Sequence, residues 1–258
     1  MNGALLQAAA VGHIYNGGQV GCEDVSFELY PGEILGVVGE SGSGKSTLLA
    51  CLSGIIRPTS GNVRFDVAGQ GLKDVFGLSE PERRMLMRTD WGVVHQNPRD
   101  GLRMAVSAGG NVGERMMNVG ARRYDDIRGA AVDWLERVEI DPERIDQLPR
   151  TFSGGMQQRV QIARILVSKP RLVFMDEPTG GLDVSVQARL LDLLRGLVRD
   201  LGVAAVVVTH DLAVVRLLSD RLMVMRHGRV VEAGLTDQVL DDPQHPYSQL
   251  LVSSVLQA

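Results

Sequence analysis

The chain has 258 residues, 44% of them hydrophobic and 22% charged, with a net charge of −4. This composition argues against an intrinsically disordered chain, which would be less apolar and more highly charged. It also argues against direct contact with nucleic acid, because such binders need basic surface to neutralise phosphates. The longest apolar run, Val203–Val208, is far shorter than the roughly 20 residues of a membrane span. The N-terminus lacks the positive start of a secretory signal.

The two cysteines, Cys22 and Cys51, form no CxxC pair and have no metal-ligand spacing. They are interpreted as reduced thiols of an intracellular protein. We therefore expect a cytoplasmic protein with no direct membrane insertion.

The predicted elements begin with N-terminal strands. The first 30 or so residues alternate weakly around turn signals, which is typical of a small antiparallel sheet. Ile34–Val38 is a short apolar run that predicts a buried strand, and Lys45–Leu52 predicts the helix after it. Asn62–Val67 is predicted to be an edge strand.

A helical, polar, Arg- and Met-rich region follows, from about Ser79 to Pro149, and Asp125–Glu139 has the helical period. Beyond it, strands and helices alternate, which implies a parallel sheet. Strands are predicted at Leu172–Met175, Val203–Val208, Leu222–Met225 and Val230–Val231, and a helix at Val184–Leu201. The pattern predicts an α/β protein with a helical insertion.

The 30 glycines gather in clusters, which suggests loops where the backbone closely approaches a ligand. One cluster, directly after Ile34–Val38, matches G-x-x-x-x-G-K-[ST] in full. We call it the phosphate-binding loop, and it comprises Gly39, Glu40, Ser41, Gly42, Ser43, Gly44, Lys45 and Ser46. Its N–H groups and the following helix N-terminus suit phosphate oxygens. Lys45 is expected to reach the β- and γ-phosphates and Ser46 to ligate Mg²⁺.

Two carboxylates end the apolar strand Leu172–Met175. In a parallel sheet the carboxyl ends of the strands open onto the crevice where ligands bind. Asp176 can therefore hold Mg²⁺ through water, and Glu177 can polarise the attacking water. The apolar run before them makes a surface cap the weaker interpretation.

A second glycine pair lies at a predicted helix start. We call Ser153–Gln157 the signature segment; in it Ser153 is the expected N-cap, and Gly154 and Gly155 expose N–H groups in the first turn. One interpretation is a phosphate site that serves a nucleotide held by another subunit. An ordinary capped helix start explains the same residues, so this pattern alone leaves both open.

Together these segments resemble the ATP-binding-cassette (ABC) ATPases over essentially the whole chain. The resemblance implies a P-loop NTPase with a mixed central sheet, an N-terminal antiparallel β subdomain and an inserted helical subdomain. We expect one domain, with an α/β core at 1–95 and 151–258 and the helical subdomain at about 96–150. It also implies ATP and Mg²⁺ as ligands, hydrolysis, and a head-to-tail dimer with a second ABC subunit.

The family's functional positions map onto this sequence one by one. The signature residues Ser153, Gly154, Gly155 and Gln157 would bind the nucleotide of the opposite subunit, and Asp183 lies in the D-loop. Gln96 would be a catalytic residue and would ligate Mg²⁺ together with Ser46 and Asp176, while Glu177 would be the catalytic base and His210 the γ-phosphate sensor. Tyr15 would stack on the adenine, and Thr47 would be a further ATP contact.

Two branches of the family share further motifs with the chain. His245–Leu251 and Asp183–Gln187 resemble the dipeptide and oligopeptide importers. Similarity to the ABC ATPase of the carbon–phosphorus (C–P) lyase system, which breaks down phosphonates, is closer. It covers Trp91–Gln96, Asp100–Arg103, Val106–Asn111, Phe174–Asp183 and Leu251–Gln257. The segment after Gln96 carries Arg99, Arg103 and a Ser107–Gly110 stretch that is predicted to be flexible. We therefore expect docking on soluble C–P lyase core subunits; a membrane importer is the alternative.

Overall fold

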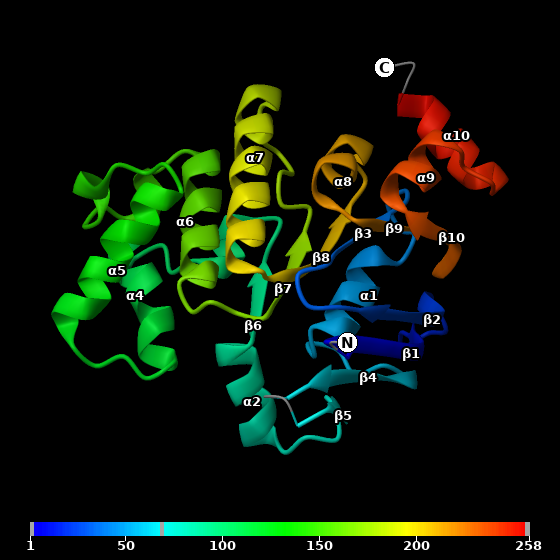
Figure 1. Ribbon diagram of the computed structural model, residues 1–258, viewed down its shortest axis with the longest axis horizontal. Helices are drawn as coiled ribbons and strands as arrows, with labels where there is room; N and C mark the ends of the chain where they lie inside the picture. Colours follow the sequence, from blue (N-terminus) through cyan, green and yellow to red (C-terminus); the bar gives the residue numbers. More distant parts are fainter. Residues whose placement is uncertain (1–2, 68–69, 256–258) are drawn as a thin grey trace. The chain divides into compact units, whose positions relative to one another are not determined.

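The computed structural model describes residues 3–67 and 70–255, and the chain divides into two compact units (Figure 1). Unit 1 is Met1–Arg84 with Ala204–Ala258, and unit 2 is Met85–Val203. Helix α2 (Glu80–Thr89) contains the boundary between them. Leu256 and Gln257, which end one of the similar motifs, lie outside the described residues.

An antiparallel sheet in unit 1 has the strand order β2-β1-β4-β5. Its strands are β1 (Leu6–Ile14), β2 (Val20–Leu29), β4 (Ser60–Asp66) and β5 (Leu72–Asp74). The prediction of an N-terminal antiparallel sheet is confirmed. The prediction that Asn62–Val67 forms an edge strand is wrong, because the short β5 pairs with the outer side of β4.

The other strands of unit 1 run in the order β10-β9-β3-β8. They are β3 (Ile34–Val38), β8 (Ala204–Thr209), β9 (Arg221–Arg226) and β10 (Arg229–Leu235). Strand β3 is parallel to β8 and β9, whereas β10 is antiparallel to β9, so the sheet is mixed. Every residue of β3 and β8 is buried, which explains their continuous apolar sequences.

Helices flank these strands of unit 1 (Figure 1). Helix α1 (Lys45–Leu52) packs against β1, β2 and β8, and α8 (Leu212–Leu218) packs on β3. Helices α9 (Thr236–Asp241) and α10 (Pro246–Val255) follow β10 and complete the unit.

Unit 2 contains the parallel pair β6 (Trp91–Val94) and β7 (Leu172–Asp176) and most of the helices. The helices are α3 (Pro98–Gly101), α4 (Ala108–Asn118), α5 (Tyr124–Arg137), α6 (Gly154–Leu166) and α7 (Val184–Leu201), with 3₁₀ turns at Pro142–Arg144 and Pro149–Thr151. In Figure 1, α4, α5 and α6 lie side by side in green, and contacts join each pair of them.

The Ser107–Gly110 stretch is not a flexible loop, contrary to the expectation from its glycines. It forms the start of α4, where Ser107 is the N-cap and its Oγ accepts the Gly110 N–H at 3.1 Å. A side-chain acceptor that satisfies a first-turn donor stabilises a helix despite glycine. Among the described residues, no helix is long and apolar enough to cross a membrane.

Candidate nucleotide site

In unit 1 the phosphate-binding loop and His210 leave adjacent strands at the same edge. Strand β3 pairs in parallel with β8, and the last register pair is Val38 with Thr209. Gly39 and His210 are the next residues along each strand, and the His210 side chain is exposed. Because carboxyl ends of parallel strands are where α/β proteins bind ligands, this edge is the expected position for a phosphate sensor.

Lys45 closes the phosphate-binding loop on itself. The side chain is only 7% exposed, and its Nζ donates to the Gly39 carbonyl at 2.7 Å and the Glu40 carbonyl at 2.8 Å. The Ser41, Gly42 and Ser46 positions are exposed. The ammonium group therefore lies at the base of the loop, where it can exchange these carbonyls for phosphate oxygens.

Gly44 is required by the way the loop enters α1. Its φ of 103° lies in the left-handed region, and a Cβ added there would come 2.1 Å from the Gly21 carbonyl oxygen. No side chain fits against a backbone oxygen at that distance.

Tyr15 lies beside the first turn of α1. Its hydroxyl oxygen is 2.9 Å from Thr47 Oγ1, and its ring makes an edge contact with the His13 ring at a centroid distance of 4.7 Å. The ring is 38% exposed, so one part of it is accessible to a ligand. The structure thus brings Tyr15 to Thr47, two of the residues that the resemblance assigns to ATP binding.

In unit 2 the register of β6 and β7 brings Gln96 and Glu177 to one edge. The last register pair is Val94 with Met175, and Gln96 and Glu177 each follow two residues after it. The Gln96 amide lies close to Gly180, where an added Cβ would be 3.4 Å from Nε2. Glu177 has a φ of 45°, which a residue with a side chain seldom adopts and which is frequent at functional sites.

The signature segment is a capped helix start. Ser153 is the N-cap of α6, and its Oγ accepts the Met156 N–H at 3.3 Å, while Gly154 is exposed. Gln157 is buried, and its amide donates to the Pro149 and Phe152 carbonyls, both at 3.0 Å. The Gln157 amide group therefore fastens the turn that leads into α6.

A hollow of about 550 Å³ in unit 2 collects several of these positions. It is lined by Gln96, Gly154, Gln157 and Gly180 and by two arginines, Arg99 and Arg150. Asp183, at the N-cap position of α7, is exposed, and its side chain does not cap that helix. The hollow therefore brings the Gln96 loop and the α6 N-terminus into one basic, polar space.

Sequence reasoning missed two buried glutamines on α6, Gln158 and Gln161. Gln161 is fully buried; its Oε1 accepts the His95 N–H at 2.8 Å and its Nε2 donates to the His95 carbonyl at 3.1 Å. Gln158 Nε2 donates to the Pro178 carbonyl at 3.0 Å. These amides fasten α6 to the residue before Gln96 and the residue after Glu177. The available signal was a pair of amides three residues apart, which share one face of the helix that the signature segment begins.

Gly101 leaves room for the Gln161 amide, so we expect Gly101→Ala to be destabilising. An added Cβ would come 2.1 Å from Gln161 Oε1, and moving that amide breaks its bonds to His95. The expected loss of unfolding free energy is about 1–3 kcal/mol, measured by urea denaturation. In a Gln161→Ala background the same change should cost much less, because the clash is gone. Equal costs in both backgrounds would contradict this account.

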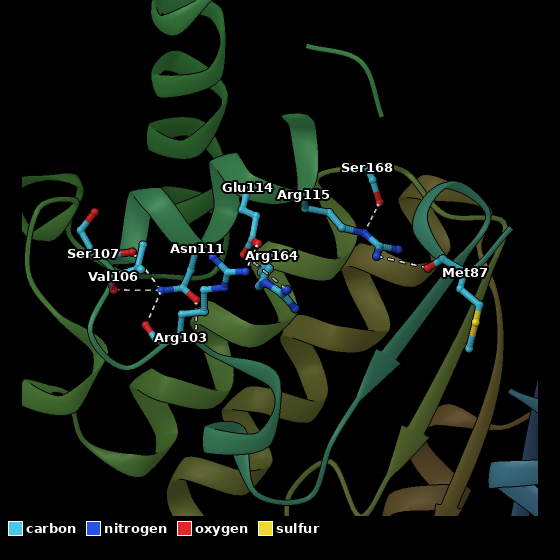
Figure 2. A network of polar contacts seen from close by, with 9 residues as sticks. All are labelled: Met87, Arg103, Val106, Ser107, Asn111, Glu114, Arg115, Arg164 and Ser168. Carbon is cyan, nitrogen blue, oxygen red and sulfur yellow. Dashed lines mark hydrogen bonds and ion pairs between the residues drawn. The ribbon is translucent and has the colours of Figure 1, made fainter. Parts of the chain in front are cut away.

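A network of polar contacts holds the segment after Gln96 to α4 and α6 (Figure 2). Asn111 accepts the Arg103 N–H through Oδ1 at 2.8 Å and donates to the Val106 carbonyl at 2.9 Å. Glu114 pairs with Arg103 at 2.9 Å and lies 3.7 Å from Arg164 of α6. Figure 2 shows both guanidinium groups directed at Glu114, so a carboxylate on α4 bridges the loop and α6.

Arg115 is a buried cation in the same network. Its guanidinium donates to Ser168 Oγ at 3.2 Å and to the Met87 and Trp91 carbonyls. Burial, reinforced by the nearby Arg164 charge, lowers the pKa of Arg115 to about 10. This side chain ties α4 to the start of β6.

Arg115→Met is expected to lower the unfolding free energy by about 3 kcal/mol, because buried carbonyls lose their donors. Chemical denaturation measures the loss. The matched change Arg123→Met, at an exposed position, should cost less than 0.5 kcal/mol. A similar, small cost at both positions would show that Arg115 does not hold this region together.

The chemistry of the donor set fits Mg²⁺. The three positions assigned to the ion supply a hydroxyl (Ser46), an amide (Gln96) and a carboxylate (Asp176). Mg²⁺ takes oxygen ligands and keeps several waters and phosphate oxygens around it. The Ser46 residue is exposed and Asp176 is half-buried.

Comparisons with known proteins agree on the family. The ABC transporter family model matches residues 22–180. The putative phosphonates utilization ATP-binding protein PhnK of Escherichia coli (strain K12) is 64% identical over 257 residues, which is 100% of both chains. The oligopeptide transport ATP-binding protein OppF of Salmonella typhimurium (strain LT2) is 39% identical over 90% of this chain and 68% of its own.

Solved structures give the same result. The chain resembles cbiO1 from Clostridium perfringens, part of the ABC transporter complex cbiONQ, with a TM-score of 0.81 and 29% identity over 94% of this chain and 92% of that one. It resembles the ATP-binding cassette MJ0796, seen as a dimer in a post-hydrolysis state with ADP and Pi, with a TM-score of 0.80 and 29% identity over 90% and 98% of the two chains. The phosphate-binding loop, the fold and these relatives together establish that the chain belongs to the ABC family and is an ABC-type ATPase.

Proposed function

We propose that this ATPase serves phosphonate catabolism by docking on the soluble C–P lyase core complex and driving its conformational cycle. The observation that carries the proposal is the 64% identity, over the full length of both chains, to a protein named for phosphonates utilization. Identity to the oligopeptide relative is 39% and covers 68% of that protein. We propose that the protein acts in the cytoplasm, where ATP is available.

Two subunits meet head to tail in this proposal, and each ATP lies between them. The phosphate-binding loop and Thr47 of one subunit hold the phosphates, and Tyr15 stacks on the adenine. The signature segment of the other subunit, through Ser153, Gly154, Gly155 and Gln157, contacts the same nucleotide, and Asp183 lies at the joint. The dimeric cassette MJ0796 supports this arrangement by analogy.

Hydrolysis needs a base and a group that stabilises the transferring phosphate. Glu177 orients and deprotonates the attacking water, and His210 donates to the γ-phosphate. Ser46, Gln96 and Asp176 would hold Mg²⁺, which would supply positive charge to neutralise the phosphates. When the γ-phosphate leaves, contacts to both subunits are lost and the halves can separate.

Gln96 is proposed to couple the presence of the γ-phosphate to movement of the helical subdomain, and through it to the partner protein. Residues 1–95 and 151–258 are proposed as the α/β core and about 96–150 as the helical subdomain. Arg99, which is exposed, and Arg103, which pairs with Glu114 of α4, lie in the segment after Gln96, and these two arginines are the proposed docking residues. The hydrogen bonds between the Gln161 side-chain amide and the His95 backbone support a mechanical link between Gln96 and α6.

The alternative is the energising subunit of a peptide-type membrane importer, favoured by the oligopeptide relative. A tagged chain purified from detergent-free lysate, with bound proteins identified by mass spectrometry, separates the two. Recovery of C–P lyase core subunits supports the proposal. Recovery of a membrane permease in a detergent extract, with no core subunit in either preparation, would overturn it.

A further inference from the structure

The His245–Leu251 motif, which marks the peptide-importer branch, has no role in the function described so far. It forms the start of α10 in unit 1. Glu232 of β10 holds the segment before the helix by accepting the N–H groups of Gln244 at 2.8 Å and His245 at 3.0 Å. Burial raises the pKa of Glu232, but hydrogen bonds that include those from the Gln244 and His245 N–H groups outweigh it, so the pKa lies below its ordinary value. An ionised carboxylate therefore fixes where the helix begins.

Tyr247 extends from this fixed segment into the core of unit 1. The side chain is 3% exposed and belongs to a cluster that includes Val38, the last residue of β3. Arg226, at the end of β9, places its guanidinium carbon 4.8 Å from the centre of the Tyr247 ring. Cation–π contact and packing together hold the ring in one position.

The Tyr247 hydroxyl accepts the backbone N–H of Glu40 at 3.1 Å, across 207 residues of sequence. Phenylalanine would fill the same apolar space, so the hydroxyl is what distinguishes Tyr247 there. A buried hydroxyl is costly without a partner, and here the partner is the second residue of the phosphate-binding loop.

The peptide group that contains the Glu40 N–H is also bonded to Lys45. Lys45 Nζ donates to the Gly39 carbonyl at 2.7 Å, so the Gly39–Glu40 peptide is held at its N–H by Tyr247 and at its carbonyl by Lys45. A second support comes from the β9–β10 turn, where the Gly228 N–H donates to the Ser43 carbonyl at 2.9 Å. Between these supports lie the exposed positions Ser41 and Gly42.

We propose that Tyr247 is a positioning residue for nucleotide binding: its hydroxyl fixes the Gly39–Glu40 peptide, so that the phosphate-binding loop keeps the shape that receives phosphates. This rests on the proposed role of that loop. Tyr247 contacts no reacting atom. Its loss changes affinity for ATP and ADP alike and leaves the hydrolytic step intact.

The test is Tyr247→Phe, which removes one hydroxyl and keeps the ring. Loss of one hydrogen bond to the loop should weaken ATP and ADP binding by about 3- to 10-fold, measured by calorimetry, with kcat within about twofold of wild type. The matched control is Tyr30→Phe. Tyr30 is 41% exposed and its hydroxyl donates to Glu28, so the variant should bind nucleotide normally.

A second variant tests the same hydrogen bond between Tyr247 and Glu40 by releasing the segment that precedes α10. Glu232→Ala releases the N–H groups of Gln244 and His245 and should weaken ATP binding in the same direction. Wild-type affinity in Tyr247→Phe, with or without a lower thermal midpoint, would overturn the inference and show a purely structural tyrosine. Failure of the underlying loop assignment is distinguishable, because Lys45→Ala would then also bind ATP normally.

Discussion

Glu177→Gln is expected to lower the ATP hydrolysis rate by about 10²–10⁴-fold while ATP binding is retained. The amide cannot accept the proton of the attacking water, but it has nearly the same size and fits the same position after β7. With hydrolysis blocked and the γ-phosphate in place, the protein should accumulate as an ATP-bound dimer. Phosphate release measures the rate, and sedimentation with and without ATP measures the dimer.

Glu143→Gln is the matched control for this variant. Glu143 is exposed in the 3₁₀ turn Pro142–Arg144. It should hydrolyse ATP at the wild-type rate. Wild-type turnover in Glu177→Gln would show that another group is the base, and a monomer that still binds ATP would contradict the composite site.

Lys45→Ala is expected to weaken ATP binding by about 10- to 100-fold, because charge-assisted hydrogen bonds to phosphate oxygens contribute roughly 1.5–3 kcal/mol. Hydrolysis should fall with binding. The buried ammonium also bonds the Gly39 and Glu40 carbonyls, so some loss of stability accompanies the change. Calorimetric titration with ATP measures the affinity, and thermal unfolding without nucleotide measures the stability.

A second lysine of unit 1 provides the comparison. Lys73 in β5 bonds the Gln70 side chain, and Lys73→Ala should bind ATP normally. If Lys45→Ala also binds ATP with wild-type affinity, the phosphate-binding loop is not the nucleotide site.

Local patterns predicted much of the fold. Helices at Lys45–Leu52 and Val184–Leu201 have the predicted bounds. A glycine-rich turn precedes the first helix, and Gly202, in the left-handed conformation, ends the second. Strand β4 was misplaced at a sheet edge because its outer neighbour β5 has only three residues, too few to show a period.

The candidate site was predicted as a list of positions, and the sequence could not indicate what supports them. The bond from Glu40 to Tyr247 spans 207 residues, and the bonds from Gln161 to His95 span 66. Such pairings cannot be predicted from a local period in the sequence, because they depend on which segments become neighbours in the fold. The left-handed backbone of Glu177 is likewise visible only in three dimensions.

The most direct test of the central claim is steady-state ATP turnover of the wild-type protein, alone and with purified C–P lyase core subunits, without detergent. The proposal predicts turnover that rises with core concentration and saturates, together with a stable complex in sedimentation. The Glu177→Gln protein should bind the core and show no such rise. Turnover that ignores the core but responds to a peptide-importer permease in vesicles would contradict the proposal.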